Sequence, residues 1–167
     1  FHDFEKERDI YEIEKWFSGK NTKIEDIAKT KKFKSINSLD AINLIKGEET
    51  NISIVFGTGK INENFINSYR GTILNLHGGD PEYYRGLDSH LWAIYHKDFN
   101  KITTTIHKLD EKLDNGEIIF KKEVPITKNS SLKTLRSENT ELCVDLVKKA
   151  IKMFEDNSFF ISTKQKQ

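Results

Sequence analysis

The sequence has little cysteine and no long apolar run, and these two absences narrow the kinds of protein it can encode. Cys143 is the only cysteine among 167 residues, so an internal disulfide is excluded and a reducing compartment is favoured. Cys143 lies among apolar residues and is interpreted as a packed side chain. No apolar stretch is long enough to cross a membrane, and no secretory signal is present. We therefore expect a cytoplasmic protein that does not associate with a membrane.

The chain also lacks an excess of charge of one sign. It has 27 Lys and Arg against 26 Asp and Glu, which gives a formal net charge of +1. Proteins that bind nucleic acid usually carry a basic patch, and here the basic residues are scattered. Metal-binding spacing is missing too, because His90 and His96 do not share a helical face and no Cys/His cluster occurs. We expect neither a nucleic-acid partner nor a metal.

What is present is an alternation of strand-like and helix-like segments. β-rich runs and helical patterns follow one another without an internal repeat or a long linker, which is typical of an α/β fold with helices flanking a sheet. The expected strands are 52–56, 72–76, 102–107 and 118–124. The expected helices are 3–18, 38–46, 61–69, 87–96 and a long one after Thr140. Residues 164–167 are expected to fray.

Apolar spacing within two of these helices predicts their buried faces. The inward residues expected for 87–96 are Leu87, Leu91, Ile94 and Tyr95. Those expected for the C-terminal helix are Leu142, Leu146, Val147, Ala150, Ile151 and Phe154. Ser38 is expected to cap the helix at 38–46.

Three polar residues near expected strand ends form a candidate catalytic group. Side chains alternate along a strand, so Asn75 and His77 point to the same side. His77 can act as acid or base near neutrality, and Asn75 can donate an amide hydrogen to an oxyanion. Asp114 can orient the imidazole and stabilise its protonated form. Residues 57–59, 77–79 and the loop up to Gly116 fall where ligands bind in open α/β sheets.

Each of these residues also has a purely structural interpretation. A histidine that ends a strand is often only a hydrogen-bonding group, and Asp114-Asn115-Gly116 is a strong turn signal. Arg85 can make a surface ion pair. His107 is catalytic by residue type, yet we interpret it as a supporting residue.

The sequence resembles the catalytic core of the 10-formyltetrahydrofolate-dependent formyltransferases. The resemblance rests on Asn75-Leu-His77-Gly-Gly-Asp-Pro-Glu-Tyr-Tyr-Arg-Gly86 and on Thr105-Ile-His107-Lys-Leu-Asp110-Glu-Lys-Leu-Asp114-Asn-Gly116-Glu-Ile-Ile119. It implies a Rossmann-like fold with a mostly parallel sheet, 10-formyltetrahydrofolate as formyl donor, and catalytic roles for Asn75, His77 and Asp114. The strands that open the family's fold are not recognisable before Ile52, so the chain looks truncated at its N-terminus.

The resemblance also implies a domain plan and binding residues. One catalytic domain is expected over 1–167, with a motif core at about 52–120 and a C-terminal helical region at about 131–160. Donor-binding residues implied by the family are Val55, Phe56, Gly57, Leu109, Asp110 and Leu113. Weaker candidates for the acceptor side are Asp80, Tyr84, Arg85 and Asp88.

The identity of the formyl acceptor is left open by the motif. Much of the family has Pro-Ser-Leu-Leu-Pro after the histidine, whereas this chain has Gly78-Gly-Asp-Pro-Glu-Tyr-Tyr84. By elimination, the resemblance favours a small amine, with a nucleotide-linked amino sugar as the best candidate. The alternatives are a 10-formyltetrahydrofolate hydrolase and a non-catalytic folate- or nucleotide-binding remnant. A homodimer is also left open.

Overall fold

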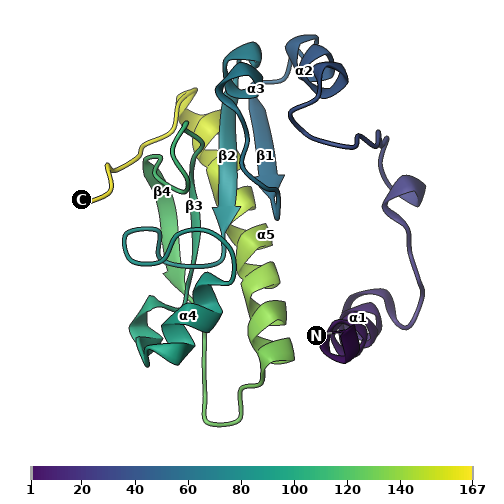
Figure 1. Ribbon diagram of the computed structural model, residues 1–167, viewed down its shortest axis with the longest axis vertical. Coiled ribbons are helices and arrows are strands. Elements are labelled where there is room, and N and C mark those ends of the chain that lie inside the picture. Colours follow the sequence, from purple (N-terminus) through teal and green to yellow (C-terminus); the bar gives the residue numbers. More distant parts are fainter. Residues whose placement is uncertain (1, 167) are drawn as a thin grey trace. The chain divides into compact units, whose positions relative to one another are not determined.

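A computed structural model describes residues 2–166 of the chain (Figure 1). These residues form two compact units. The smaller unit holds the residues up to Lys32 together with Pro125–Glu138, and the larger unit holds Phe33–Val124 together with the residues from Asn139 onward. The expected single catalytic domain over 1–167, with its motif core and helical region, stays a prediction.

The smaller unit is built around the helix α1 (His2–Phe17), which confirms the helix expected at 3–18. A single 3-10 turn, η1 (Ile24–Asp26), follows it. Within this unit the Lys15 ammonium donates to the hydroxyl of the fully buried Ser137 over 2.7 Å. The contact joins the two chain segments of the unit.

The larger unit contains a four-stranded sheet with the order β1-β2-β3-β4. Its strands are β1 (Ile52–Phe56), β2 (Thr72–His77), β3 (Thr103–Lys108) and β4 (Ile118–Glu123). The α/β fold with flanking helices is confirmed. The expectation of a mostly parallel sheet is wrong, because β1 and β2 are parallel while β2–β3 and β3–β4 are antiparallel.

The connections between strands explain the mixed directions. A short loop joins β3 to β4, and neighbouring strands joined by a short loop run antiparallel, whereas parallel neighbours need a long crossover. Between β2 and β3, the helix α4 (Ser89–Tyr95) and the turn η2 (Phe99–Lys101) stay near the end where β2 finishes (Figure 1). Strand β3 therefore starts from that end and runs back along β2.

One face of the sheet packs against α2 (Leu39–Lys46) and α3 (Glu63–Ser68). The hydroxyl of Ser38 accepts the backbone N–H of Ala41 at 3.3 Å, so the expected cap of α2 is confirmed. The buried residues of this cluster are Ala41, Val55, Ile61, Phe65, Tyr69 and Ile73.

The other face packs against α5 (Leu132–Asn157), where the buried cluster consists of Leu74, Ile106, Ile119, Leu146, Ala150 and Phe160. The helix begins before Thr140, earlier than expected, because its first two turns are mostly polar and carry no apolar stripe. Ile151 was expected to face inward, but its side chain is 38% exposed. Of the other residues expected to face inward, Leu146 and Ala150 belong to this cluster, and Val147 and Phe154 pack against it. Leu142 is buried but lies outside the cluster.

The buried face of α4 differs from the expected one. Leu87 and Tyr95 are 77% and 75% exposed, whereas Ser89 and His90 are buried. The Ser89 hydroxyl lies 3.0 Å from the carbonyl of Gly86, and His90 Nε2 lies 2.6 Å from the carbonyl of Thr103. These bonds satisfy the buried polar groups, and apolar spacing gives no sign of them.

The end of the chain is held in place as far as residue 166, so the expected fraying of 164–166 is wrong; residue 167 lies outside the described residues. Thr163 and Ile118 exchange two backbone hydrogen bonds of 2.8 Å. Phe160 is buried against α5 and the sheet. Backbone pairing with β4 supplies order here that the polar sequence does not suggest.

Candidate active site

The candidate site lies on the α2–α3 side of β2. Ile73, Asn75 and His77 alternate with Leu74 and Leu76 along the strand, so the first three share a face. Ile73 belongs to the apolar cluster, whereas the two residues beyond it are polar. The same strand face therefore changes from core to site within a few residues.

Strand β3 adds His107 to this face. Its antiparallel register places His107 directly opposite Asn75 and Thr105 opposite His77. The His107 side chain is 1% exposed, and the Thr105 hydroxyl donates to the carbonyl of Gly79 over 2.8 Å. The family motif gave His107 only a supporting role; its direct contact with Asn75 follows from a strand direction that the sequence did not reveal.

Asp114 reaches the site from an unexpected side. The loop after β3 begins beside Ile73, since the N–H of Leu109 donates to the Ile73 carbonyl over 2.8 Å. Because β3 is antiparallel, this loop starts at the end opposite to the carboxyl ends of β1 and β2, but it reaches the expected place, since Asp114 contacts His77 at the end of β2. The loop then turns back at Asp114, whose φ of 47° is left-handed. Gly116 is required nearby, because a Cβ there would lie 1.7 Å from the carbonyl oxygen of Lys108.

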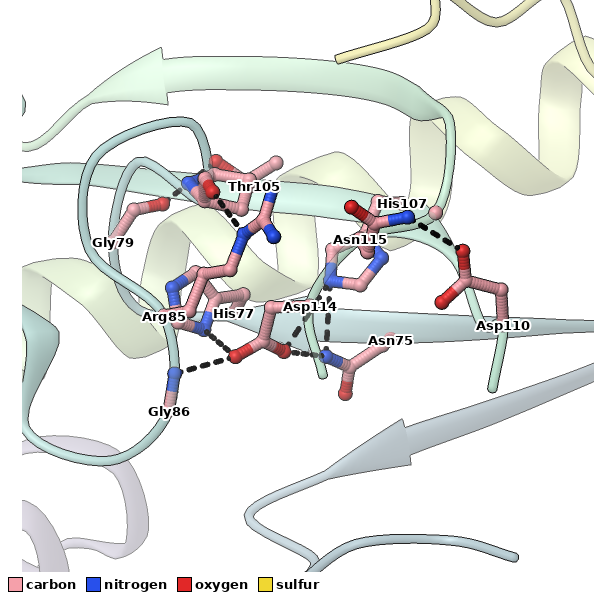
Figure 2. Close-up of polar contacts among 12 residues, drawn as sticks. Asn75, His77, Gly79, Arg85, Gly86, Thr105, His107, Asp110, Asp114 and Asn115 are labelled. Atoms are coloured by element: carbon pink, nitrogen blue, oxygen red, sulfur yellow. Dashed lines mark hydrogen bonds and ion pairs between the residues drawn. The ribbon is translucent and has the colours of Figure 1, made fainter. Parts of the chain in front are cut away.

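The Asp114 carboxylate is the centre of the polar contacts in Figure 2. One oxygen, Oδ1, accepts from the side-chain amide of Asn75 at 3.0 Å. The other, Oδ2, accepts the backbone N–H of Gly86 at 2.7 Å and lies 3.5 Å from Nδ1 of His77. The three residues Asn75, His77 and Asp114, singled out in the sequence, thus meet in one place.

Both hydrogens of the Asn75 amide nitrogen are engaged. His107 Nδ1 lies 2.7 Å from the carbonyl of Lys108 and donates to it, so its neutral Nε2 is an acceptor. Asn75 Nδ2 lies 3.1 Å from that Nε2, and its second hydrogen goes to Asp114. In this arrangement Asn75 must release one partner before it can donate to an oxyanion.

His77 is buried between two acceptors. Its Nε2 donates to the carbonyl of Tyr84 at 2.9 Å, and its Nδ1 faces the Asp114 carboxylate. Burial lowers the pKa of His77 below its ordinary value, although the charge of Asp114 and the Tyr84 carbonyl act in the opposite direction. Burial therefore favours the neutral ring, which has one N–H for these two contacts, whereas both contacts favour the protonated ring.

The carboxylate beside it is ionised. Burial raises the pKa of Asp114, but the polar groups around the carboxylate, among them the Gly86 N–H, outweigh burial, so this pKa lies below its ordinary value. A neutral imidazole next to an ionised carboxylate can accept a proton and pass it on. That is the chemistry of a general base that later acts as an acid.

An open hollow adjoins Asn75. Its walls are two loops, 58–61 after β1 and 109–114 after β3. Of the expected donor-binding residues, Leu109, Asp110 and Leu113 line the hollow, whereas Val55, Phe56 and Gly57 do not. The Asp110 carboxylate also accepts bonds from the Lys112 N–H and the Asn115 side chain, which shape the loop.

The expected acceptor-side residues lie around the segment after β2. Asp80 is 2% exposed, and both its oxygens lie 3.1 Å from the Lys121 ammonium. The Tyr84 hydroxyl bonds to Asp98, which raises the pKa of Tyr84 to about 12. Arg85 donates to the carbonyl of Pro81 at 2.8 Å. Asp88 has a left-handed φ of 57° and precedes α4.

The described residues provide neither a metal site nor a membrane-spanning helix. Among residues 2–166, no group of three or more His, Cys, Asp or Glu side chains is arranged to hold a metal ion. Within the same part of the chain, no helix combines the length and the apolar character needed to cross a membrane.

Comparison with known proteins gives consistent matches. A family model described as "Formyl transferase" matches residues 18–151. Phosphoribosylglycinamide formyltransferase of Haemophilus influenzae is 30% identical over 92 residues, which cover 55% of this chain and 43% of that protein. A methionyl-tRNA formyltransferase of Prochlorococcus marinus is 28% identical over 118 residues, which cover 70% of this chain and 35% of that protein. The chain spans less than half the length of these curated relatives.

A solved structure shares the fold. The formyltransferase PseJ from Anoxybacillus kamchatkensis superposes with a TM-score of 0.62 at 22% identity, covering 84% of this chain and 68% of that chain. It was determined in complex with UDP-4,6-dideoxy-4-formamido-L-AltNAc and tetrahydrofolate.

Proposed function

Because the chain belongs to the formyl transferase family, we propose that the protein moves a formyl group from 10-formyltetrahydrofolate to a small amine, with a nucleotide-linked amino sugar as the acceptor class. One observation carries this proposal: the Asp114 carboxylate contacts the Asn75 amide, the Gly86 N–H and the His77 ring at once. A carboxylate in that position supports proton transfer by the imidazole. Asn75, His77 and Asp114 are the proposed catalytic residues.

In the proposed reaction the neutral acceptor amine attacks the formyl carbon. A nitrogen–carbon bond forms, and the formyl oxygen becomes an oxyanion. His77 takes a proton from the attacking nitrogen, and Asp114 stabilises the resulting imidazolium. The oxyanion then collapses, the bond from the formyl carbon to N10 of the folate breaks, and His77 returns the proton to N10.

The site as described is not yet open to such a substrate. Nε2 of His77 is bonded to the Tyr84 carbonyl, and Nδ1 faces Asp114. For Nε2 to accept a proton from substrate, it must leave the carbonyl, which requires the segment 78–86 to shift, and the single proton of the neutral ring must lie on Nδ1, facing Asp114. Asn75 can likewise donate to the oxyanion only after it gives up its bond to His107 or its bond to Asp114. A hydrogen bond between neutral groups contributes about 0.5–1.5 kcal/mol and one to a charged group about 1.5–3 kcal/mol, so substrate groups that replace these partners would offset the exchange.

The hollow beside Asn75 is the proposed place of the folate donor. The hollow is open to solvent and lies directly beside Asn75. Leu109, Asp110 and Leu113 supply one wall. Val55, Phe56 and Gly57 lead into the opposite wall at residues 58–61 and are proposed only as its support.

The acceptor class rests on two weaker observations. The net charge of +1 offers little attraction to a polyanion such as tRNA. A protein of the same fold was solved with a UDP-linked formamido sugar and tetrahydrofolate. The curated relatives, by their names, formylate other amines, so phosphoribosylglycinamide and methionyl-tRNA are the competing acceptors. Asp80, Tyr84, Arg85 and Asp88 stay candidates for the acceptor side, but the bond of Asp80 to Lys121 makes it the weakest of them.

The test offers 10-formyltetrahydrofolate with each acceptor in turn: a panel of UDP- and dTDP-linked amino sugars, phosphoribosylglycinamide, and aminoacylated initiator tRNA. Each reaction is run at low and at physiological salt. We expect turnover with an amino sugar and weak salt dependence. Efficient tRNA formylation that falls steeply with salt would overturn the acceptor class. Release of formate without any acceptor would point to the hydrolase, and folate binding without turnover to the non-catalytic remnant.

A further inference from the structure

The side-chain amide of Gln165 makes three hydrogen bonds to two different loops. Its Nε2 donates to the carbonyl of Asp114 at 2.8 Å and to the carbonyl of Gly116 at 2.9 Å. Its Oε1 accepts from Nη2 of Arg85 at 3.0 Å. Both amide hydrogens and the amide oxygen are thus used, and the reversed amide would place its oxygen against two carbonyls.

These three bonds converge on the surroundings of one carboxylate. Arg85 directly precedes Gly86, whose N–H donates to Asp114 Oδ2 at 2.7 Å. The other two bonds hold the turn that carries Asp114 itself. Gln165 therefore fixes both the residue that bears the carboxylate and the segment that binds it.

The turn at Asp114 needs outside support. Its left-handed φ of 47° is unfavourable for an L-residue, although Asp tolerates this region better than most residues. Strained conformations of this kind persist only where neighbouring contacts hold them. The two carbonyls bound by Gln165 lie at Asp114 and two residues beyond it, so the amide spans the strained residue.

Gln165 is delivered to the turn by an anchored backbone. Before it, Thr163 pairs with Ile118 of β4, and Phe160 is buried in the cluster against α5. After it, the N–H of Lys166 donates to the Glu82 carboxylate at 2.8 Å. The amide is held from both sides, which suits a fixed support rather than a passing contact.

We propose that Gln165 is a positioning residue for formyl transfer: it sets the separation of the Asp114 carboxylate from the His77 imidazole, so that the segment 160–166 controls the rate without touching substrate. The effect on rate rests on the proposed function, whereas the effect on the separation does not. The 3.5 Å contact between Oδ2 and Nδ1 is the quantity at stake. If the turn relaxes, the imidazolium formed during transfer loses part of its stabilisation.

The experiment compares Gln165→Ala and Gln165→Glu with a matched control, Lys164→Gln, at the exposed neighbouring position. Gln165→Glu keeps an oxygen for Arg85 but presents no hydrogen to the Asp114 and Gly116 carbonyls, so it breaks only one arm. The first measurement is the pKa of His77 by NMR titration; the His77 signal is the one that is absent from the spectrum of His77→Asn. The second is kcat together with KM for 10-formyltetrahydrofolate.

We expect the pKa of His77 to fall further in Gln165→Ala, because burial is then less opposed by Asp114, whereas the added negative charge of Gln165→Glu acts against this fall. A shift of the catalytic carboxylate should lower kcat about tenfold to a hundredfold, with a smaller change in KM. Lys164→Gln should match the parent in both measurements. In an Asp114→Asn background, Gln165→Ala should add little, since residues that act through one group are not additive.

Two results would overturn the proposal. One is an unchanged His77 titration in both Gln165 variants, and the other is a full additional rate loss in the Asp114→Asn background. A parent protein without any formyl transfer would instead refute the proposed function. The titration would still decide the role of Gln165, because it needs no turnover. Gln165→Glu keeps the test usable if the alanine variant does not fold.

Discussion

The two faces of β2 are built from alternate residues of one strand, yet they differ in how they are held. Leu74 and Leu76 point to the α5 side, where Leu74 is fully buried in an apolar cluster. Asn75 and His77 point to the other side, where their polar atoms contact Asp114, His107 and the Tyr84 carbonyl. The strand thus separates an apolar packing surface from a polar site by the direction of its side chains.

The contacts on the two faces of β2 differ in how strongly they depend on the direction of the groups that make them. Apolar burial is non-directional and scales with the area removed from water, so the α5 side depends on volume. On the site side each donor has a defined acceptor, and removing one leaves another buried group without a partner. Substitutions on the α5 side should therefore cost stability, and those on the site side should cost rate.

The largest effect is expected for His77→Ala on the site side. Loss of the general base should lower kcat/KM by about 10²–10⁴-fold, while the folding cooperativity stays that of the parent. Initial rates of formyl transfer and a thermal unfolding curve measure both quantities. A rate within about threefold of the parent would show that the imidazole is structural.

The opposite outcome is expected for Leu74→Ala on the α5 side. Truncating this fully buried side chain should lower the free energy of unfolding by about 2–5 kcal/mol, with kcat close to that of the parent wherever the variant is folded. Leu87→Ala is the matched control, because Leu87 is 77% exposed and its loss should change stability by less than about 0.5 kcal/mol. Urea titrations give both values. Equal losses for the two leucines would contradict the comparison.

An intermediate effect is expected for Asp114→Asn. Asparagine tolerates the left-handed backbone, so the turn should persist, but the charge that stabilises the imidazolium is lost. An opposite charge at this range shifts a pKa by roughly 1–3, so kcat should fall about tenfold to a thousandfold, and the folate Kd should change much less. Stopped-flow rates and a folate binding titration separate the two. A large rise in Kd with unchanged kcat would assign Asp114 to binding instead.

The smallest effect is a pH dependence of stability. The pKa of His77 is lowered by burial in the folded state, so below the ordinary value near 6.5 the unfolded chain takes up a proton that the folded chain does not. Stability should therefore fall as the pH drops from about 7 towards the folded pKa. Asp114, whose pKa is also lowered, adds a loss at more acidic pH. Urea midpoints over this range, compared with those of His77→Gln, measure the first contribution; a steeper slope in His77→Gln would contradict its sign.

Much of the secondary structure could be predicted because local periodicity determines it. The strand at 52–56 was expected with the bounds of β1, and Ser38 caps α2 as its residue type suggested. Strand direction could not be predicted in the same way, because alternation reads the same forwards and backwards. The position of His107 beside Asn75 depends on that direction and was therefore missed as a contact.

Contacts made by isolated polar residues were the other feature that could not be predicted from the sequence. Ser89 and His90 are buried through bonds to backbone carbonyls, so the apolar spacing of residues 87–96 missed them; of the residues expected to face inward, Leu91 and Ile94 are half-buried, and Leu87 and Tyr95 are exposed. Gln165 lies in a polar tail without periodicity, and only the folded chain shows what it binds. The order of Asn75, His77 and Asp114 was recognisable from the family motif, whereas the backbone of Tyr84 and Gly86 carries no signal of its own.

Strand β1 occupies one border of the sheet, and no strand among residues 2–166 pairs with its outer side. Phe56 and Ile54 on this strand are 55% and 38% exposed. A border of this kind presents a row of backbone donors and acceptors that can extend the sheet with another chain. We therefore expect the isolated protein to self-associate more as its concentration rises. Kinetic and unfolding measurements are best made in dilute solution, with light scattering as a check for association.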